Sequence, residues 1–138
     1  MVSGMDDLDV APSTGMPFAD LVGIRIVDST AEEVRGLLDW APERCTSGGV
    51  LHGGALMALA DSLGGVCAFL NLPTGTLTAT IESKTNFFRP VTRGTVEAVA
   101  RPLHVGKSTI VVQTDLLDEE GRRVAQVTQT QAVIKPGS

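Results

Sequence analysis

The sequence has few of the residues that build disulfide frameworks, metal sites or nucleic-acid surfaces. Its two cysteines, Cys45 and Cys67, are too few and too oddly placed for a disulfide framework, and no C-x-x-C motif is present. Its two histidines have no spacing that matches a zinc site, so we expect no metal and no cofactor. The 11 Lys and Arg form no cluster and are outnumbered by 16 Asp and Glu, for a net charge of −5. This balance argues against nucleic acid as a partner.

The first residues also lack a basic segment followed by an apolar one. We therefore expect no secretory signal, and a cytoplasmic location. Residues 1–15 are acidic and rich in Ser, Gly and Pro, which predicts a disordered tail. Residues 16–135 contain no long linker and no internal repeat, so we expect a single domain there.

What the chain does have is one long apolar stretch, residues 51–72, built almost entirely from Leu, Ala, Val, Met, Phe and Gly. Its length and composition predict a helix that is buried on nearly every side. Because it carries His52, Asp61 and several glycines, it is a poor membrane span, and we expect no membrane partner. Removing a carboxylate from water is costly unless it has a partner, so Asp61 is a candidate functional group.

The start of this helix predicts a site for an anion. A turn at residues 48–49 leads to His52, and Gly53 and Gly54 open the helix. The first backbone N–H groups of a helix have no partner within it and lie at the positive end of its dipole. Two glycines let a ligand approach this backbone closely. Gly53 is therefore a candidate donor to a carbonyl oxygen that becomes negative during a reaction.

Helical geometry prevents Asp61 from sharing a pocket with the start of its own helix. Asp61 lies nine residues after His52, which is roughly 900° of rotation, or half a turn out of phase. It also lies about 12 Å along the axis from Gly53. The simplest composite site uses two antiparallel helices across a dimer interface, with Gly53 of one chain facing Asp61 of the other. We therefore expect at least a dimer.

The rest of the chain reads as strands. Residues 95–101 alternate, with Val96, Ala98 and Ala100 on one face and polar residues on the other, which is typical of a half-buried strand. A helical turn is expected at residues 16–21. The expected strands cover residues 22–28, 34–40, 76–89, 95–101, 108–117 and 122–134. This order predicts an α+β fold in which a curved antiparallel sheet wraps around one long central helix.

Three segments of the chain form a recognisable set. They are Leu51-His52-Gly53-Gly54, Leu59-Ala60-Asp61 and Asn86-Phe87-Phe88-Arg89-Pro90. Together they resemble the hotdog-fold acyl-CoA thioesterases, and most closely their PaaI-like group. This group includes thioesterases for phenylacetyl-CoA, 4-hydroxybenzoyl-CoA and dihydroxynaphthoyl-CoA. The similarity covers residues 18–134, nearly the whole chain.

This resemblance implies a fold, an assembly and a set of roles. Two subunits join their sheets and lay their helices antiparallel, and dimers pair into tetramers. The N–H of Gly53 polarises the thioester carbonyl, and Asp61 of the partner subunit acts as general base or as nucleophile. His52 is a further catalytic candidate. From the residues alone, it either contacts the substrate or fixes its loop by bonding a backbone carbonyl, and we favour the second.

For coenzyme A, the resemblance points to Arg89, Ser108 and Thr109. Arg89 and Lys107 are also cations near the later strands of an otherwise acidic chain, which favours phosphate recognition. For the acyl group, Gly64 and Gly65 leave space beside Asp61 for a flat ring or a short chain. The expected substrate-binding residues are Thr46, Gly54, Met57 and Gly65, and Leu56, Gly64 and Ala68 are further candidates to line the acyl pocket.

The chain departs from its relatives at two of these positions. Relatives often carry Asn or Gln where this chain has Thr46, which offers no amide donor. They often carry Ser or Thr where it has Gly65, so a hydroxyl that could hold the attacking water is missing.

The sequence leaves rival functions open. Thioester hydrolysis leads, because the resemblance implies it. The sequence contains no Ser-His-Asp order and no Gly-x-Ser-x-Gly motif, which argues against a serine hydrolase. The alternatives are a hotdog hydroxyacyl-thioester dehydratase and a non-catalytic acyl-CoA-binding module.

Overall fold

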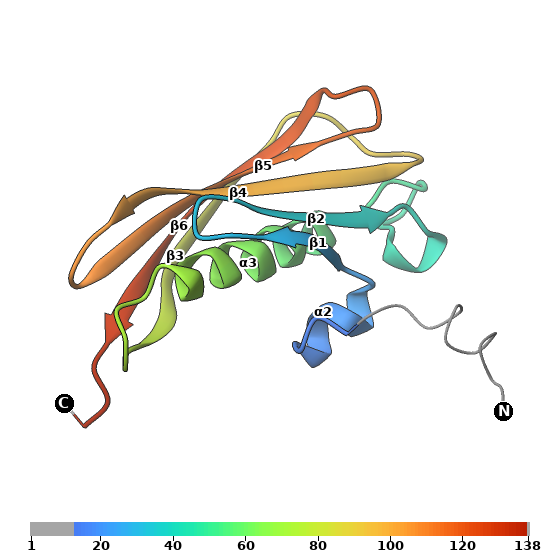
Figure 1. Cartoon of the computed structure of the whole chain (residues 1–138). Coiled ribbons are helices and arrows are strands. Elements are labelled where there is room, and N and C mark those ends of the chain that lie inside the picture. The colour runs from blue at the N-terminus through green and yellow to red at the C-terminus, as the bar shows by residue number, and fades with distance from the viewer. Residues whose placement is uncertain (1–12, 138) are drawn as a thin grey trace, which may run out of the picture.

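A six-stranded antiparallel sheet curves around the long helix α3 (Gly53–Leu70) in the computed structural model, which describes residues 13–137 (Figure 1). This confirms the expected α+β arrangement. The predicted disordered tail falls mostly on residues 1–12, which lie outside the described residues. Within the described part, Ser13 and Thr14 donate hydrogen bonds to the carboxylate of Asp20.

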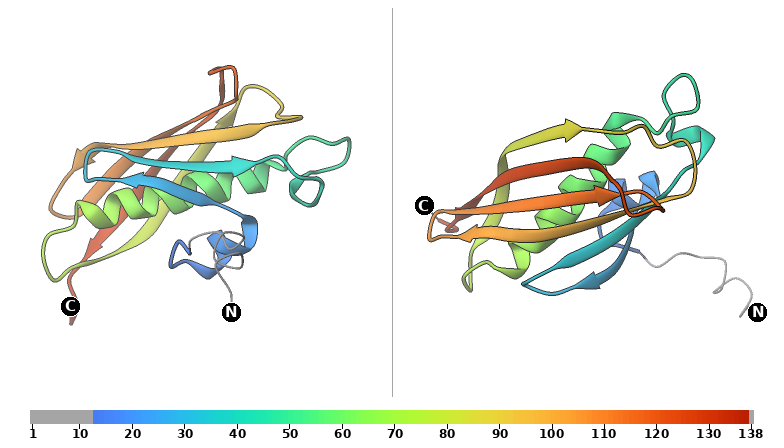
Figure 2. Two further views of the ribbon diagram at one scale, coloured as in Figure 1. Left: turned by 45° about the vertical axis from the view of Figure 1, so that its right-hand side comes forward. Right: turned by 90° about the horizontal axis from the view of Figure 1, so that it is seen from above.

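The other elements lie on both sides of α3 in the chain. They are α2 (Pro17–Val22), β1 (Arg25–Ser29), β2 (Val34–Asp39), the 3-10 turn η1 (Pro42–Arg44), β3 (Leu77–Phe87), β4 (Thr95–Val105), β5 (Thr109–Leu117) and β6 (Arg123–Ile134). The order of the strands in the sheet, β1-β2-β4-β5-β6-β3, differs from their order in the chain, and β1 and β3 form the two edges. The short helix α2 lies on the side of α3 away from the sheet (Figures 1 and 2).

The core lies between α3 and the concave face of the sheet. Leu59, Leu63 and Cys67 of α3 are fully buried there. The alternation predicted for β4 is confirmed, because Val96 and Ala98 are also fully buried. Burial of such side chains supplies most of the favourable free energy of folding.

The prediction that α3 is buried on nearly every side is wrong for the single chain. One face is open, with Met57 43% and Phe69 63% exposed. By length and composition α3 could also cross a membrane, but a core helix passes the same test, and here α3 packs on the sheet. Exposed apolar surface of this kind is typical of interaction sites and ligand-binding grooves.

The first strand begins later than predicted. Val22 ends α2 rather than starting a strand, and Gly23 follows it with φ at 94°. Glycine suits this left-handed conformation. The guanidinium of Arg44 fills the space beside Gly23 and donates hydrogen bonds to the carbonyls of Val22 and Asp39. Arg44 thereby ties the end of α2 to the segment that leads into α3.

Candidate active site

The first turn of α3 leaves one backbone donor free. The Nδ1 of His52 accepts a hydrogen bond of 2.8 Å from the N–H of Gly54, and the His52 carbonyl accepts from Ala55 and Leu56. Among the described residues, the N–H of Gly53 has no acceptor. It lies at the positive end of the helix dipole, as the sequence predicts. The structure therefore leaves Gly53 able to donate to an anionic oxygen.

His52 caps the helix, and this corrects one detail of the sequence analysis. The imidazole bonds a backbone N–H, not the backbone carbonyl that we expected. Because Nδ1 is the acceptor, the proton of the neutral ring lies on Nε2. A Cβ at Gly54 would lie 2.9 Å from Nδ1, so a side chain at that position would disturb the cap. The glycine at position 54 thus leaves the cap undisturbed, whatever it does for the substrate.

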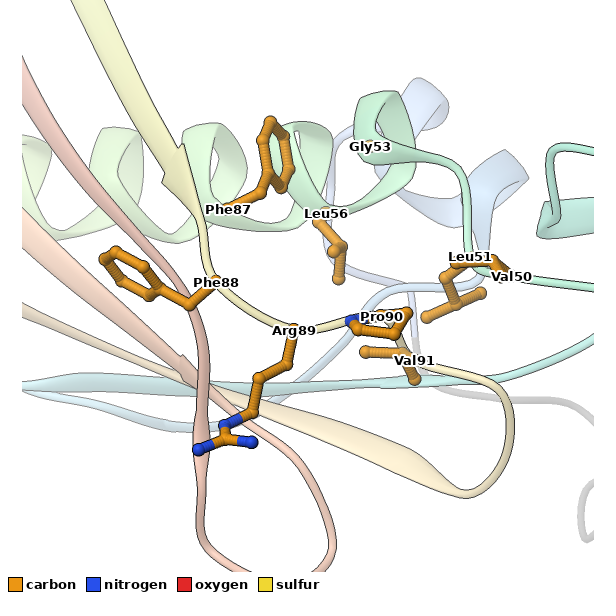
Figure 3. A pocket seen from close by; sticks show the side chains of 9 residues that line it. All are labelled: Val50, Leu51, Gly53, Leu56, Phe87, Phe88, Arg89, Pro90 and Val91. Carbon is orange, nitrogen blue, oxygen red and sulfur yellow. The ribbon is translucent and has the colours of Figure 1, made fainter.

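An apolar cavity of about 370 Å³ opens beside Gly53 (Figure 3). The ring of Phe87 covers the glycine closely, since a Cβ there would lie 3.1 Å from the ring. Arg89 also borders the cavity, but its side chain points away from Phe87 and Gly53 (Figure 3). The lining residues are Val50, Leu51, Gly53, Leu56, Phe87, Phe88, Arg89, Pro90 and Val91.

Asp61 lies on the open face of α3, in a different cavity of about 330 Å³. Within residues 13–137 its carboxylate has no hydrogen-bond or ion-pair partner. Its mainly apolar surroundings raise its pKa above the ordinary value, because burial disfavours the charged form. Its side chain is nevertheless exposed in the single chain. A carboxylate with a raised pKa is suited to accept a proton.

One chain therefore does not bring Asp61 and Gly53 into the same cavity. This agrees with the helical geometry derived from the sequence. Within the described part of the chain, a donor and a carboxylate without partners lie on the same helix and are separated along it. Together they could activate water and stabilise a negative oxygen, but only across two chains.

The other predicted acyl-group residues divide into two sets. Met57 is exposed on the open face of α3, and Gly65 borders the Asp61 cavity with open space beside it. Gly64 does not leave space for a ligand, because the side chain of Gln129 occupies that space. Ala68 is fully buried in the core, so it lines no acyl pocket either.

Two further predicted residues lie elsewhere. Thr46 lies in the loop before α3, where its backbone N–H donates to the Val50 carbonyl, and it lines neither cavity. Leu56 does line the cavity beside Gly53.

The candidate CoA-binding residues fall at opposite ends of the sheet. Thr109 pairs with Ala132 of β6, whereas the N–H of Arg89 donates to the carbonyl of Val124. These two positions on β6 are about 26 Å apart along the strand, at about 3.3 Å per residue. Lys107 and Ser108 lie together, at the Thr109 end. A single chain therefore does not bring Arg89 close to residues 107–109.

The sequence analysis missed the polar residues that border the Asp61 cavity from the sheet. They are Thr78 and Thr80 of β3 and Gln131 of β6. Gln131 is 2% exposed, and Gln129 on the same face is fully buried. The spacing of Val127, Gln129 and Gln131 puts both glutamines on the buried face of an alternating strand. That pattern could have revealed them.

The chain matches the family model described as the thioesterase superfamily over residues 48–125, which include Gly53, Asp61 and the wall of the cavity beside Gly53. The chain belongs to this superfamily. It has the hotdog fold of the PaaI-like group, and it is an enzyme of the thioester hydrolase class.

Individual proteins are similar over most of the domain. The Bacillus subtilis protein ComA2 is 36% identical over 118 residues, which cover 84% of this chain and 93% of that protein. The 1,4-dihydroxy-2-naphthoyl-CoA hydrolase of Escherichia coli is 35% identical over 86 residues, 62% of this chain and 63% of that protein. The solved structure of a variant of the phenylacetic acid degradation protein PaaI of Thermus thermophilus is 25% identical. It superposes with a TM-score of 0.78 and covers 85% of this chain and 98% of that one.

Proposed function

We propose that this protein hydrolyses acyl-CoA thioesters at a site built from two subunits. Gly53 of one subunit donates its N–H to the thioester carbonyl, and Asp61 of the other takes a proton from water. The observation that carries the proposal is that, within residues 13–137, neither the N–H of Gly53 nor the carboxylate of Asp61 on the same helix has a partner. Both groups are needed for the reaction, and one chain keeps them apart.

The reaction follows from these two groups. The oxygen of water bonds to the thioester carbon while one of its protons passes to Asp61. The carbonyl electrons move to the oxygen, and the N–H of Gly53 and the helix dipole stabilise the resulting negative charge. When the carbonyl re-forms, the C–S bond breaks. Coenzyme A leaves as a thiolate and takes up the proton, and the free acid is released.

A dimer across β3 supports this proposal. β3 is an edge strand of 11 residues, and Leu77 and Ile81 on it are 57% and 61% exposed. A long apolar edge strand tends to pair with another strand. Pairing two copies of β3 antiparallel would also lay the open faces of the two α3 helices against each other. Pairing of such dimers into a tetramer, and a cytoplasmic location, stay predictions.

The same pairing supports a role for both ends of the sheet in binding coenzyme A. In an antiparallel pair, residues 107–109 of one subunit approach the Arg89 end of the other. Arg89 makes no ion pair within the described part of the chain, is exposed, and borders the cavity with its side chain pointing away from Phe87 and Gly53. A guanidinium so placed suits the phosphates of the nucleotide, which stay in water while the acyl group enters the cavity.

The acyl group is proposed to be aromatic or of short to medium length. The cavity beside Gly53 is small and has two phenylalanine rings, Phe87 and Phe88, in its wall. Aromatic walls favour a flat ring, since offset and edge-to-face contacts add to the burial of area. One relative is named for a bicyclic aromatic acyl-CoA, which supports the same class.

The test is release of free thiol from benzoyl-, phenylacetyl-, hexanoyl- and palmitoyl-CoA by the purified protein, with light scattering on the same sample. We expect hydrolysis of at least one of the first three, and a dimer or larger assembly. A preference for palmitoyl-CoA would contradict the acyl class. Hydration of an enoyl-CoA without hydrolysis would identify a dehydratase instead, and binding without turnover a binding module. An active monomer would contradict the composite site.

A further inference from the structure

Three polar side chains form a hydrogen-bonded chain beside Asp61. The hydroxyl of Thr78 donates to the Oε1 of Gln131 at 3.0 Å. The Nε2 of Gln131 donates to the hydroxyl oxygen of Thr80 at 2.7 Å. All three residues border the cavity of about 330 Å³ that holds Asp61. This series of hydrogen bonds thus runs from β3 to β6 and back to β3, and it ends at the cavity.

The direction of these bonds leaves a donor at Thr80. Each half of the Gln131 amide already has a partner, and the Thr80 oxygen accepts from it. Within residues 13–137, no acceptor takes the hydroxyl proton of Thr80. Among the residues that border the cavity, Asp61 is the only carboxylate. A free donor and a free acceptor therefore lie around one small space.

The local structure holds Thr80 in this position. The register of β3 against β6 shifts between Thr80 and Glu82, which marks a β-bulge beside Thr80. Bulges re-aim the side chains next to them and are frequent near active sites. Gln131 is 2% exposed, and a buried amide is costly unless both of its ends are paired. Thr78 and Thr80 pair the two ends of the amide, and these bonds fix its orientation.

Gln129, two residues earlier on the same face, shows the opposite arrangement. It is fully buried against Gly64, and neither its Oε1 nor its Nε2 has a partner among the described residues. It borders none of the cavities described above. Of the two buried glutamines, Gln131 is therefore the one that is connected to the reaction space.

We propose that Thr80 holds the attacking water against Asp61, and that Gln131 is the positioning residue that orients Thr80. This proposal rests on the proposed function. A water that accepts from Thr80 and donates to Asp61 has its second lone pair free for the thioester carbon. Its proton passes to Asp61 as the C–O bond forms, and Thr80 exchanges no proton. The sheet would thus supply the hydroxyl that α3 lacks at Gly65.

The first experiment compares Thr80→Val with Thr80→Ser, using the best substrate of the panel. The valine has a similar shape but no hydroxyl, and we expect kcat to fall about tenfold or more with KM within about twofold, as for the loss of one hydrogen bond in the transition state. The serine keeps the hydroxyl and should keep activity within about threefold. Ser83→Ala is the control, since Ser83 lies on the same strand but does not border the cavity.

A second experiment tests whether Gln131 acts through Thr80. Gln131→Met should lower kcat less than Thr80→Val does. The double variant should be no slower than Thr80→Val alone, because two residues that serve one interaction are not additive. A merely structural glutamine would instead give effects that multiply. Melting temperature and assembly size are measured for each variant.

A rescue experiment uses Gly65, which borders the same cavity and has open space beside it. Gly65→Ser offers a new hydroxyl one helical turn after Asp61, and it should recover part of the activity lost in Thr80→Val.

The outcomes separate this proposal from the proposed function. If the wild type hydrolyses no thioester, the proposed function fails and this proposal fails with it. If the wild type is active and Asp61→Asn is not, but Thr80→Val retains the wild-type kcat, only the present proposal is wrong. It is also wrong if Thr80→Ser loses as much activity as Thr80→Val while both remain folded and assembled.

Discussion

The two faces of α3 have similar residue types but different surroundings. On one face, Leu59 and Leu63 are fully buried against the sheet. On the other, Met57 and Gly65 flank Asp61, whose carboxylate has no partner among residues 13–137, and the face is open. The first face holds the subunit together. The second is the face that we propose to carry the chemistry, and an exposed apolar surface of this kind is typical of interaction sites. A helix that is apolar all round can thus serve a core and an interface at once.

The largest expected effect concerns the open face. Asp61→Asn keeps the shape of the side chain but removes its basicity, so kcat should fall by roughly a hundredfold or more, within the 10²–10⁴ range of general-base catalysis. KM and assembly should change little. Steady-state kinetics and light scattering test this, with Asp28→Asn as the control, because Asp28 is an exposed carboxylate on β1 that does not border the Asp61 cavity. Near wild-type turnover by an assembled Asp61→Asn variant would make the carboxylate structural and end the proposed mechanism.

A substitution on the buried face should instead lower stability and leave activity unchanged. Leu63→Ala should lower the free energy of unfolding by about 2–5 kcal/mol, through lost burial and a residual cavity. The fraction that stays folded should keep its specific activity, because Leu63 borders neither cavity. Denaturant unfolding measures the first and kinetics the second. Leu63→Met, which nearly conserves volume, should cost about 1.5 kcal/mol or less.

The effect of a substitution on nucleotide binding should be separable from the effects of substitutions on either face of α3. Arg89→Ala removes a cation at the mouth of the cavity, and KM for acyl-CoA should rise about tenfold with kcat nearly unchanged. Arg93→Ala is the matched control, because Arg93 is ion-paired with Glu120 and lies outside the cavity. Acyl-pantetheine thioesters, which lack the nucleotide, should be hydrolysed equally by Arg89→Ala and wild type. An equal loss with both substrates would rule out phosphate recognition.

The smallest expected effect is in the dependence on pH. Because burial raises the pKa of Asp61, the acid limb of kcat/KM should lie above the ordinary aspartate range, with activity rising as the carboxylate ionises. A raised pKa in the folded state also means that stability falls as pH rises from the ordinary aspartate pKa to the raised one, so the ionised carboxylate disfavours folding at neutral pH. Asp61→Asn should therefore lose the acid limb, and it should melt no lower than wild type at pH 7. A lower melting temperature at pH 7 would show that the carboxylate has a stabilising partner.

Local sequence pattern was enough to predict features that depend on residues close together in the chain. The apolar run predicted α3, the alternation at Val96 and Ala98 predicted β4, and the glycines predicted the free donor at Gly53. Helical phase predicted that Gly53 and Asp61 would be apart in one chain.

The contacts that could not be predicted are those that depend on which strands are neighbours in the sheet. β3 pairs with β6 at the far end of the chain, and only this pairing places Gln131 beside Thr80. In the same way, nothing local shows that Gln129 fills the space at Gly64. The prediction of a strand from residue 22 was wrong at its start, because Val22 is the last residue of α2 and Gly23 is its C-cap.

The place of β3 in the chain also bears on synthesis. β3 leaves the ribosome before β4 and β5, yet its partner in the described sheet is β6, the last strand. Until residues 123–134 emerge, the nascent chain carries an unpaired strand beside an apolar helix, the kind of surface that chaperones bind and that aggregates. Gln131 emerges near the end of that segment. A chain released early therefore lacks both the strand that covers β3 and the amide that orients Thr80.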